Sequence, residues 1–351
     1  MSVLLLPLAL TSRKNPPGEL ADWLCLSNGE LVWFADRHGF RDQTVEGPLR
    51  HYRYRCLPKR SGGLRLLEVP KPRLMNIQRQ ILHGIFDKIP PHNAAHAFCP
   101  GRSVATYVAP HAGQQVLLHV DLQDFFPSTR ASRVHALLRT VGYPERVARL
   151  LTALCTHCAR SDAFDGVDSE AFDLRTRQRY RQSHLPQGAP TSPALANLCA
   201  WRLDVRLTAF AARFGAAYTR YADDLLFSGG HDLQRGMTRF RILVLAIALN
   251  EGFSIQSRKT RVLLQSQSQR VAGLVLNEHP NPIRQEYDRL KAQLFNCVRH
   301  GPASQNREER ANFAQHLRGK IAYLKMINPQ RGSKLQALFD QIQWGESGGS
   351  D

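Results

Sequence analysis

The stretch RYADDLLFSGG (220–230) decides the fold. Residues 218–221 before its two aspartates and residues 225–227 after them are β-prone, which predicts two strands joined by a tight turn with Asp223 and Asp224 at the tip. Side chains alternate between the two faces of an extended strand, so adjacent carboxylates serve one site only where a turn interrupts the alternation. Taken alone, an acidic turn fits a solvated loop as well as a functional site.

A second acidic segment, HVDLQDFFPS (119–128), ends the apolar run QVLLHVDL (115–122), which we expect to be a strand. Carboxylates brought together from Asp121, Asp223 and Asp224 would repel one another unless cations lay between them. Oxygen ligands suit Mg²⁺, and two ions about 3.5–4 Å apart support phosphoryl transfer. We therefore expect a site for two Mg²⁺ ions, at which Mn²⁺ could substitute.

A third segment, LPQGAPTSPALANL (185–198), is a Pro- and Gly-rich loop that leads into a helix. Gly188 and the prolines around it predict a stiff bend to which a base pair can come close, with Gln187 as a polar contact to an incoming nucleotide. Ser192 is the expected N-cap and Pro193 the first helical residue. The apolar face expected further along the same helix consists of Leu203, Leu207, Phe210 and Phe214.

Composition shifts near residues 50 and 280 predict three parts, residues 1–50, 51–280 and 281–351. The middle part mixes strands with expected helices at 73–89 and 235–250, an α+β pattern, and the last part is helical. Two apolar faces are expected there. They are formed by Tyr287, Leu290, Leu294 and Val298, and by Phe313, Leu317, Ile321 and Leu324.

The chain carries 47 Lys and Arg against 29 Asp and Glu, a formal charge of +18, which favours a polyanionic partner such as nucleic acid. Residues 284–334 hold 11 Lys and Arg and 4 Asp and Glu, so the helical part is expected to contact the backbone of a duplex.

Several features indicate a cytoplasmic protein without a membrane partner. No apolar run reaches the roughly 20 residues of a spanning helix. The opening MSVLLLPLAL lacks a charged region before it, so we interpret it as a short packed element rather than a secretory leader. Seven scattered cysteines indicate reduced thiols, and Cys155 and Cys158 are expected to be buried helix residues rather than zinc ligands.

Together, HVDLQDFFPS, LPQGAPTSP and YADD in this order resemble the reverse transcriptases, from about Tyr54 to Asn328. The resemblance implies a right-hand polymerase fold: fingers and palm over 51–280 and a basic, helical thumb over 281–351. It also implies that Asp121, Asp223 and Asp224 are the catalytic metal ligands, with the Leu122 carbonyl as an additional oxygen.

Further positions of the resemblance concern the nucleotide. LPKRSGGLRLLEVPKP (57–72) supplies Lys59 and Arg65, which match residues that contact the triphosphate. Phe126 matches the aromatic gate that occupies the space of a ribose 2′-hydroxyl, so deoxynucleotides (dNTPs) are the expected substrates. Lys259 in GFSIQSRKTRVL (252–263) matches a lysine placed to neutralise or protonate the leaving pyrophosphate.

Within the family the chain resembles the bacterial retron enzymes, which carry an N-A-x-x-H element before the first catalytic strand and a V-T-G element after the YADD hairpin. PHNAAHAF (91–98) supplies Asn93 and His96 for the first, and RVAGLVLN (270–277) supplies Val271 and Gly273 for the second, with Ala272 replacing Thr. These four residues are the expected contacts to template RNA. The resemblance implies a structured noncoding RNA that is template and primer, a 2′-hydroxyl start, a branched RNA–DNA product (msDNA) and an effector protein in anti-phage defence.

Two alternatives remain. Ala272 leaves open a free-standing, group II intron-like reverse transcriptase that extends an annealed 3′ end. From a different class, the chain could be a non-catalytic RNA-binding scaffold with the polymerase fold, although Lys59, Arg65 and Gln187 beside an intact acidic trio argue against it.

Overall fold

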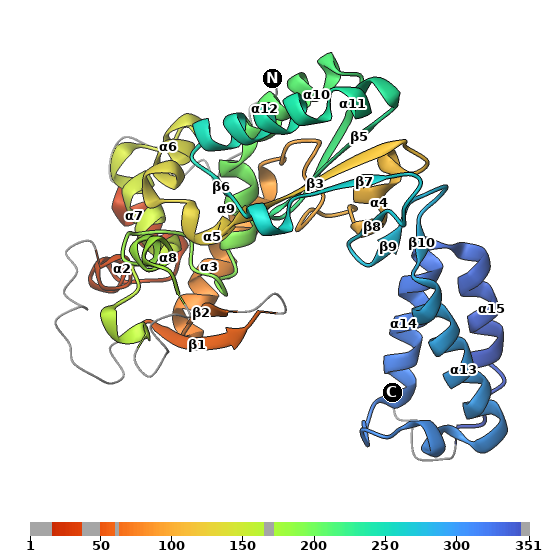
Figure 1. Cartoon of the computed structure of the whole chain (residues 1–351). Coiled ribbons are helices and arrows are strands. Elements are labelled where there is room, and N and C mark those ends of the chain that lie inside the picture. Colours follow the sequence, from red (N-terminus) through yellow and green to blue (C-terminus); the bar gives the residue numbers. More distant parts are fainter. Residues whose placement is uncertain (1–15, 37–49, 60–62, 165–171, 345–351) are drawn as a thin grey trace.

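The computed structural model describes residues 16–36, 50–59, 63–164 and 172–344. An antiparallel sheet with helices packed over it lies at the centre of Figure 1, between a two-stranded hairpin and a bundle of three helices. The architecture is the α+β right-hand arrangement expected of a polymerase. The opening apolar stretch, MSVLLLPLAL, lies outside the described residues.

The central sheet has the strand order β4-β5-β3-β6, and β7 also pairs with β3. β4 (Ala217–Tyr221) and β5 (Asp224–Gly229) form the expected antiparallel hairpin, and β3 (Val116–Gln123) pairs with β5. Short β6 (Ser254–Ile255) and β7 (Arg261–Leu264) complete the sheet. The predicted strands, and the acidic turn between β4 and β5, are therefore confirmed.

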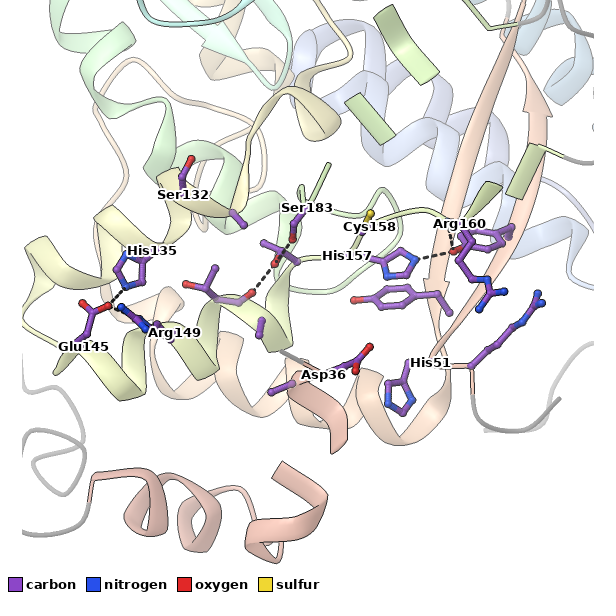
Figure 2. A pocket seen from close by; sticks show the side chains of 18 residues that line it. Asp36, His51, Ser132, His135, Glu145, Arg149, His157, Cys158, Arg160 and Ser183 are labelled. Carbon is purple, nitrogen blue, oxygen red and sulfur yellow. Dashed lines mark hydrogen bonds and ion pairs between the residues drawn. The ribbon is translucent and has the colours of Figure 1, made fainter. Parts of the chain in front are cut away.

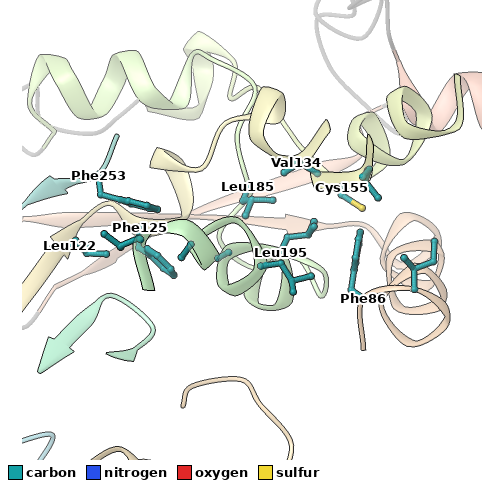
Figure 3. Packing of buried hydrophobic residues seen from close by; sticks show 14 of the residues in the cluster. Phe86, Leu122, Phe125, Val134, Cys155, Leu185, Leu195 and Phe253 are labelled. Atoms are coloured by element: carbon teal, nitrogen blue, oxygen red, sulfur yellow. The ribbon is translucent and has the colours of Figure 1, made fainter. Parts of the chain in front are cut away.

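The two faces of β3 enter different clusters because its side chains alternate. Val116, Leu118, Val120 and Leu122 point into the main core with helices α9 (Ser192–Cys199), α10 (Trp201–Arg213) and α12 (Met237–Asn250). Figure 3 shows part of this core, where Phe125, Leu185 and Leu195 pack together. Leu117 faces a second cluster, so Asp121, an even number of residues away, points to that side and not into the main core.

Two helix predictions need correction, and a third is confirmed within two residues. The segment after Ser192 is two helices that meet at Ala200, and its N-cap is Thr191, because the Ser192 hydroxyl donates to the Pro186 carbonyl over 2.7 Å instead. The helix expected at 235–250 is α12, which ends at Asn250 as expected and begins two residues late, after Gly236 separates it from the short helix α11 (His231–Arg235). The one expected at 73–89 ends at Gly84 as α3 (Pro72–Gly84), and a 3₁₀ turn, η3 (Phe86–Lys88), follows.

A separate antiparallel hairpin consists of β1 (Tyr52–Pro58) and β2 (Leu64–Pro70). Two N-terminal helices, α1 (Pro16–Trp23) and α2 (Asn28–Ala35), contribute Leu20 and Phe34 to the main core, where α7 (Glu145–Cys155) also packs. Cys155 is buried at the end of α7, as expected, but Cys158 lies beyond the helix and is partly exposed. The remaining described elements before β4 are α4 (Val104–Val108), η4 (Ala109–His111), α5 (Phe125–Ser128), α6 (Ala131–Val141), η5 (Ser161–Phe164) and α8 (Leu174–Tyr180).

After the central sheet the chain forms the small sheet of β8 (Arg270–Val271), β9 (Leu274–Val275) and β10 (Asn281–Pro282). The bundle that follows consists of α13 (Arg284–His300), η8 (Pro302–Gln305), α14 (Phe313–Ile327) and α15 (Pro329–Phe339). Both expected apolar faces line its core except at Val298, which is exposed while the adjacent Cys297 is buried. Among the described residues no helix has the length and apolarity to cross a membrane.

Candidate active site

Antiparallel pairing brings the three aspartates of the sequence analysis together. Asp121 on β3 lies directly opposite Asp224 on β5, and Asp223 occupies the turn just before β5. The Leu122 amide donates to the Asp223 carbonyl over 2.9 Å, so the turn is attached to the end of β3. Ala222 adopts a φ of 55°, the left-handed conformation that folds the tight turn. Local turn geometry and strand register therefore determine the acidic cluster.

The electrostatics of the cluster show mutual repulsion. Burial, followed by the charges of Asp224 and Asp121, raises the pKa of Asp223 to about 6. Burial also raises the pKa of Asp121, against the opposing effect of a hydrogen bond from Lys259. Like-charged oxygens held together in this way fit a hard divalent cation.

The carboxylates are also paired with two basic side chains. Lys259 Nζ donates to Asp121 Oδ2 over 2.9 Å, and His119 Nε2 lies 2.9 Å from Asp224 Oδ1. Within the described ranges, no three acidic, histidine or cysteine side chains converge closely enough to hold an ion in these orientations. The donor chemistry fits a metal, whereas in the present orientations Asp121 and Asp224 are paired with Lys259 and His119.

Asp124 organises the residues expected to meet the nucleotide. Its Oδ2 accepts from Arg179 Nη1 and from the Thr176 hydroxyl, each at 2.9 Å, and its Oδ1 lies 3.9 Å from Lys59 Nζ. Asp124 itself has a φ of 51° and precedes α5, which carries Phe126. The structure thus brings Lys59, from the β1–β2 hairpin, beside the segment that joins Asp121 to Phe126.

Other expected nucleotide residues lie on β2 and the loop before α9. Arg65 is exposed on β2, and the Gln187 carbonyl accepts from the Glu68 amide of the same strand over 2.8 Å. Gly188 has a φ of 128°, and a Cβ there would lie 3.1 Å from the Glu68 carbonyl oxygen. The close approach that requires glycine at this position is therefore that of strand β2, and not only that of a base pair.

Buried Glu68 on β2 lies next to His157, one of the residues that line a cavity of about 660 Å³. Glu68 Oε2 lies 2.8 Å from His184 Nε2, and its Oε1 lies 3.9 Å from His157 Nε2. Figure 2 shows His157 at the cavity with its hydrogen bond to a tyrosine, the Tyr54 hydroxyl, at 2.8 Å. The two histidines also pair through their backbones, so β1, β2 and the nucleotide loop are held as one unit.

A buried ion pair that the sequence did not predict lies beneath the acidic turn between β4 and β5. Arg220 on β4 and Asp204 on α10 are both fully buried, and Arg220 donates two hydrogen bonds to Asp204, of 2.8 and 2.6 Å. Arg220 Nη1 also donates to Asn197 Oδ1 over 2.8 Å and to the Ala222 carbonyl over 3.1 Å. The signal in the sequence was an arginine at a strand position within YTRYADD, but its partners lie in distant segments.

The expected RNA-contacting residues lie on two segments next to the hairpin. Residues 94–96 run beside β4, with the Arg220 amide donating to the Ala94 carbonyl and the His96 amide donating to the Arg220 carbonyl. Asn93 is exposed, whereas burial, followed by Arg102 and Arg220, lowers the pKa of His96 to about 4. Only one residue separates Ala94 from His96, so the match to N-A-x-x-H was wrong in its spacing.

The second of these segments, RVAG, forms the turn between β8 and β9. Val271 is buried in the cluster that also contains Leu274 and Ile327, so its side chain cannot contact RNA. Ala272 and Gly273 form the exposed tip with φ values of 49° and 79°. A β-branched residue such as threonine adopts such a φ poorly, so the turn gives a local structural reason for alanine rather than threonine at position 272.

Comparison with known proteins agrees with this geometry. The family model described as "Reverse transcriptase (RNA-dependent DNA polymerase)" matches residues 57–276. The chain is 42% identical over 288 residues to the Retron Mx65 reverse transcriptase of Myxococcus xanthus, covering 82% of this chain and 64% of that protein.

Two further relatives carry similar names. The Retron Mx162 reverse transcriptase of Myxococcus xanthus is 35% identical, over 92% of this chain and 66% of that protein. The Retron Ec86 reverse transcriptase of Escherichia coli is 27% identical, over 83% of this chain and 82% of that protein. The chain thus spans slightly less than two thirds of the length of the two Myxococcus proteins.

Proposed function

The chain belongs to the reverse transcriptase family, on its bacterial retron-type branch, and we propose that it is an RNA-directed DNA polymerase that copies part of a structured noncoding RNA. The observation that carries the proposal is the register of β3 against β5, which sets Asp121 opposite Asp224 with Asp223 in the adjoining turn. Lys59 and Phe126 lie on segments that meet at Asp124 in the same region.

The role proposed for each residue follows from the position of its side chain. Two Mg²⁺ ions, held by Asp121, Asp223, Asp224 and the Leu122 carbonyl, would activate an attacking hydroxyl and stabilise the leaving pyrophosphate. Lys259, hydrogen-bonded to Asp121, is near enough to neutralise or protonate that leaving group. Lys59 and Arg65 bind the triphosphate, Gln187 contacts the incoming nucleotide, and Phe126 excludes a ribose 2′-hydroxyl.

The finer proposal concerns the RNA. We propose that residues 51–280 act as fingers and palm, that residues 281–351 act as a thumb on the duplex, and that Asn93, His96 and the turn at Gly273 contact the template. Synthesis begins from an RNA 2′-hydroxyl and yields msDNA, and the enzyme acts in the cytoplasm with an effector protein in anti-phage defence. Residues 1–50 are the proposed extension that the effector could contact. The names of the relatives support the retron assignment.

Primer extension on an RNA template with dNTPs and Mg²⁺ tests the catalytic proposal. Wild-type protein should extend the primer, and Asp223→Asn should not, because it removes a proposed metal ligand without changing the size of the side chain. Equal activity in the two proteins, or no extension by the wild type, would refute it and favour the scaffold alternative.

A separate experiment tests priming. Nucleic acid that copurifies with the chain is treated with RNase and with a debranching enzyme. A DNA species that carries RNA through a 2′ branch is the expected product. DNA without any branch-linked RNA would remove the 2′-hydroxyl proposal and support extension of an annealed 3′ end.

A further inference from the structure

Phe98 is an exposed aromatic residue between two buried neighbours. Its exposed fraction is 53%, whereas those of Ala97 and Cys99 are 1% and 8%. Its backbone φ is 57°, in the left-handed region that bulky side chains rarely adopt. Surrounding contacts must therefore hold this conformation, and strained positions of this kind concentrate at functional sites.

The contacts that hold Phe98 come from the framework of the acidic turn. Asn197 Nδ2 donates to the Ala97 carbonyl over 2.8 Å, and Asn197 Oδ1 accepts from Arg220, which also holds the Ala222 carbonyl. On the other side, Cys99 Sγ donates to the Ala97 carbonyl over 3.1 Å. Phe98 is therefore presented to solvent at a fixed position relative to Asp223.

Its ring lies next to the proposed sugar gate. The ring centroids of Phe98 and Phe126 are 6.3 Å apart, with an angle of 51° between the rings. The segment that carries Phe98 runs along β4, at one edge of the sheet, whereas Lys259 follows β6 at the other edge. Phe98 thus lies on the opposite side of the acidic turn from the residue assigned to the pyrophosphate.

This placement indicates which base Phe98 meets. The base of an incoming nucleotide extends from its sugar away from the triphosphate, and its template partner lies beyond it. An aromatic ring stacks on any base, because every base has a π face, and this suits a template of varying sequence. We propose that Phe98 stacks on the template base at the insertion position. The inference rests on the proposed polymerase function and adds a template contact to it.

The test compares binding of two primer–templates in EDTA, one intact and one without the base at the insertion position. Wild-type protein should bind the intact template about tenfold more tightly, a typical effect of one aromatic–base stack. Phe98→Ala should bind both equally, at the level of wild type on the template that lacks the base. Phe98→Trp should keep the preference.

Leu249→Ala is the matched control, because Leu249 on α12 is also an exposed large apolar residue, at 60%. It should retain the tenfold preference. A Phe98→Ala protein that keeps this preference, or that loses affinity equally for both templates, would overturn the inference. So would a variant with unchanged template binding but a raised KM for dNTPs, since the ring would then contact the incoming base.

The two proposals fail differently. If wild-type protein extends a primer and Phe98→Ala matches it in every binding measurement, only the template contact is refuted. If wild-type protein neither binds nor extends any primer–template, the polymerase function itself is refuted, and this inference with it.

Discussion

Removing one partner of the buried Arg220–Asp204 pair should destabilise the protein strongly. Both side chains are 0% exposed, and Arg220→Met would leave the Asp204 carboxylate with the Tyr218 hydroxyl, 2.8 Å away, as its remaining partner. An unpaired buried charge costs about 3–5 kcal/mol, so the free energy of unfolding should fall by about that amount. The substitution also removes the hydrogen bond to the Ala222 carbonyl, so polymerase activity should fall as well.

A double-substitution cycle separates the pair from the general effect of changing the core. Arg220→Met, Asp204→Leu and the double variant are unfolded in urea at pH 7, and the free energies are compared. The double variant removes both charges, so its loss should be smaller than the sum of the two single losses by about 2–3 kcal/mol. Arg235→Met is the control, because the Arg235–Asp232 pair is 81% and 89% exposed and should contribute little.

Two outcomes would refute this reasoning. Single substitutions that cost less than about 1 kcal/mol would show that water or rearrangement compensates the orphaned charge. Additive losses would show that the two residues do not act as a pair. In either case the Arg220–Asp204 pair would not stabilise the core beneath the acidic turn.

Three further predictions follow from individual contacts. Burial, followed by the charge of His96, lowers the pKa of His111 to about 3 from an ordinary 6.5, so between pH 7 and pH 5 only the unfolded state takes up this proton. The free energy of unfolding, measured by urea titration, should therefore fall by about 2 kcal/mol over this range, and His111→Asn should reduce the fall. Gly188→Ala should lower the free energy of unfolding by about 1–3 kcal/mol, because the new Cβ would meet the Glu68 carbonyl at a backbone φ of 128°. Gly236→Ala is the control and should cost less, since its Cβ would lie 3.5 Å from the nearest atom. Equal losses in the two variants would contradict the close approach of β2 at Gly188. Phe126→Ala should incorporate ribonucleotides that the wild type rejects, and a variant without this gain in primer extension would refute the gate.

The features that could be predicted from sequence depend on local chemistry. The YADD hairpin follows from β-prone residues on both sides of a turn, and β3 follows from an apolar run at 115–122, within one residue of its observed bounds. The start of α12, two residues after the one expected at 235, also has a local signal, since Gly236 precedes it and glycine weakens a helix. Ala200 gives no such signal, because alanine is the best helix former.

The features that could not be predicted depend on distant pairings. One contact of the site is an exception: His119 could have been predicted to lie beside the acidic cluster, since it comes two residues before Asp121 on the same face of β3. Nothing in the sequence pairs Arg220 with Asp204, or Asp124 with Arg179 and Thr176, because each pair forms only when separate helices and strands pack. The spacing error at His96 arose from motif matching and not from folding.

Burying an arginine carries a desolvation cost, and apolar residues of similar volume often stabilise a core equally well. Here its hydrogen bonds have directions that an apolar side chain lacks: it holds Asp204 on α10, Asn197 on α9 and the Ala222 carbonyl in the acidic turn. Asn197 in turn holds the Ala97 carbonyl, next to Phe98. The proposed metal-binding turn and the proposed template contact are therefore positioned from the same guanidinium, which gives a buried charge a structural role that an apolar side chain could not fill.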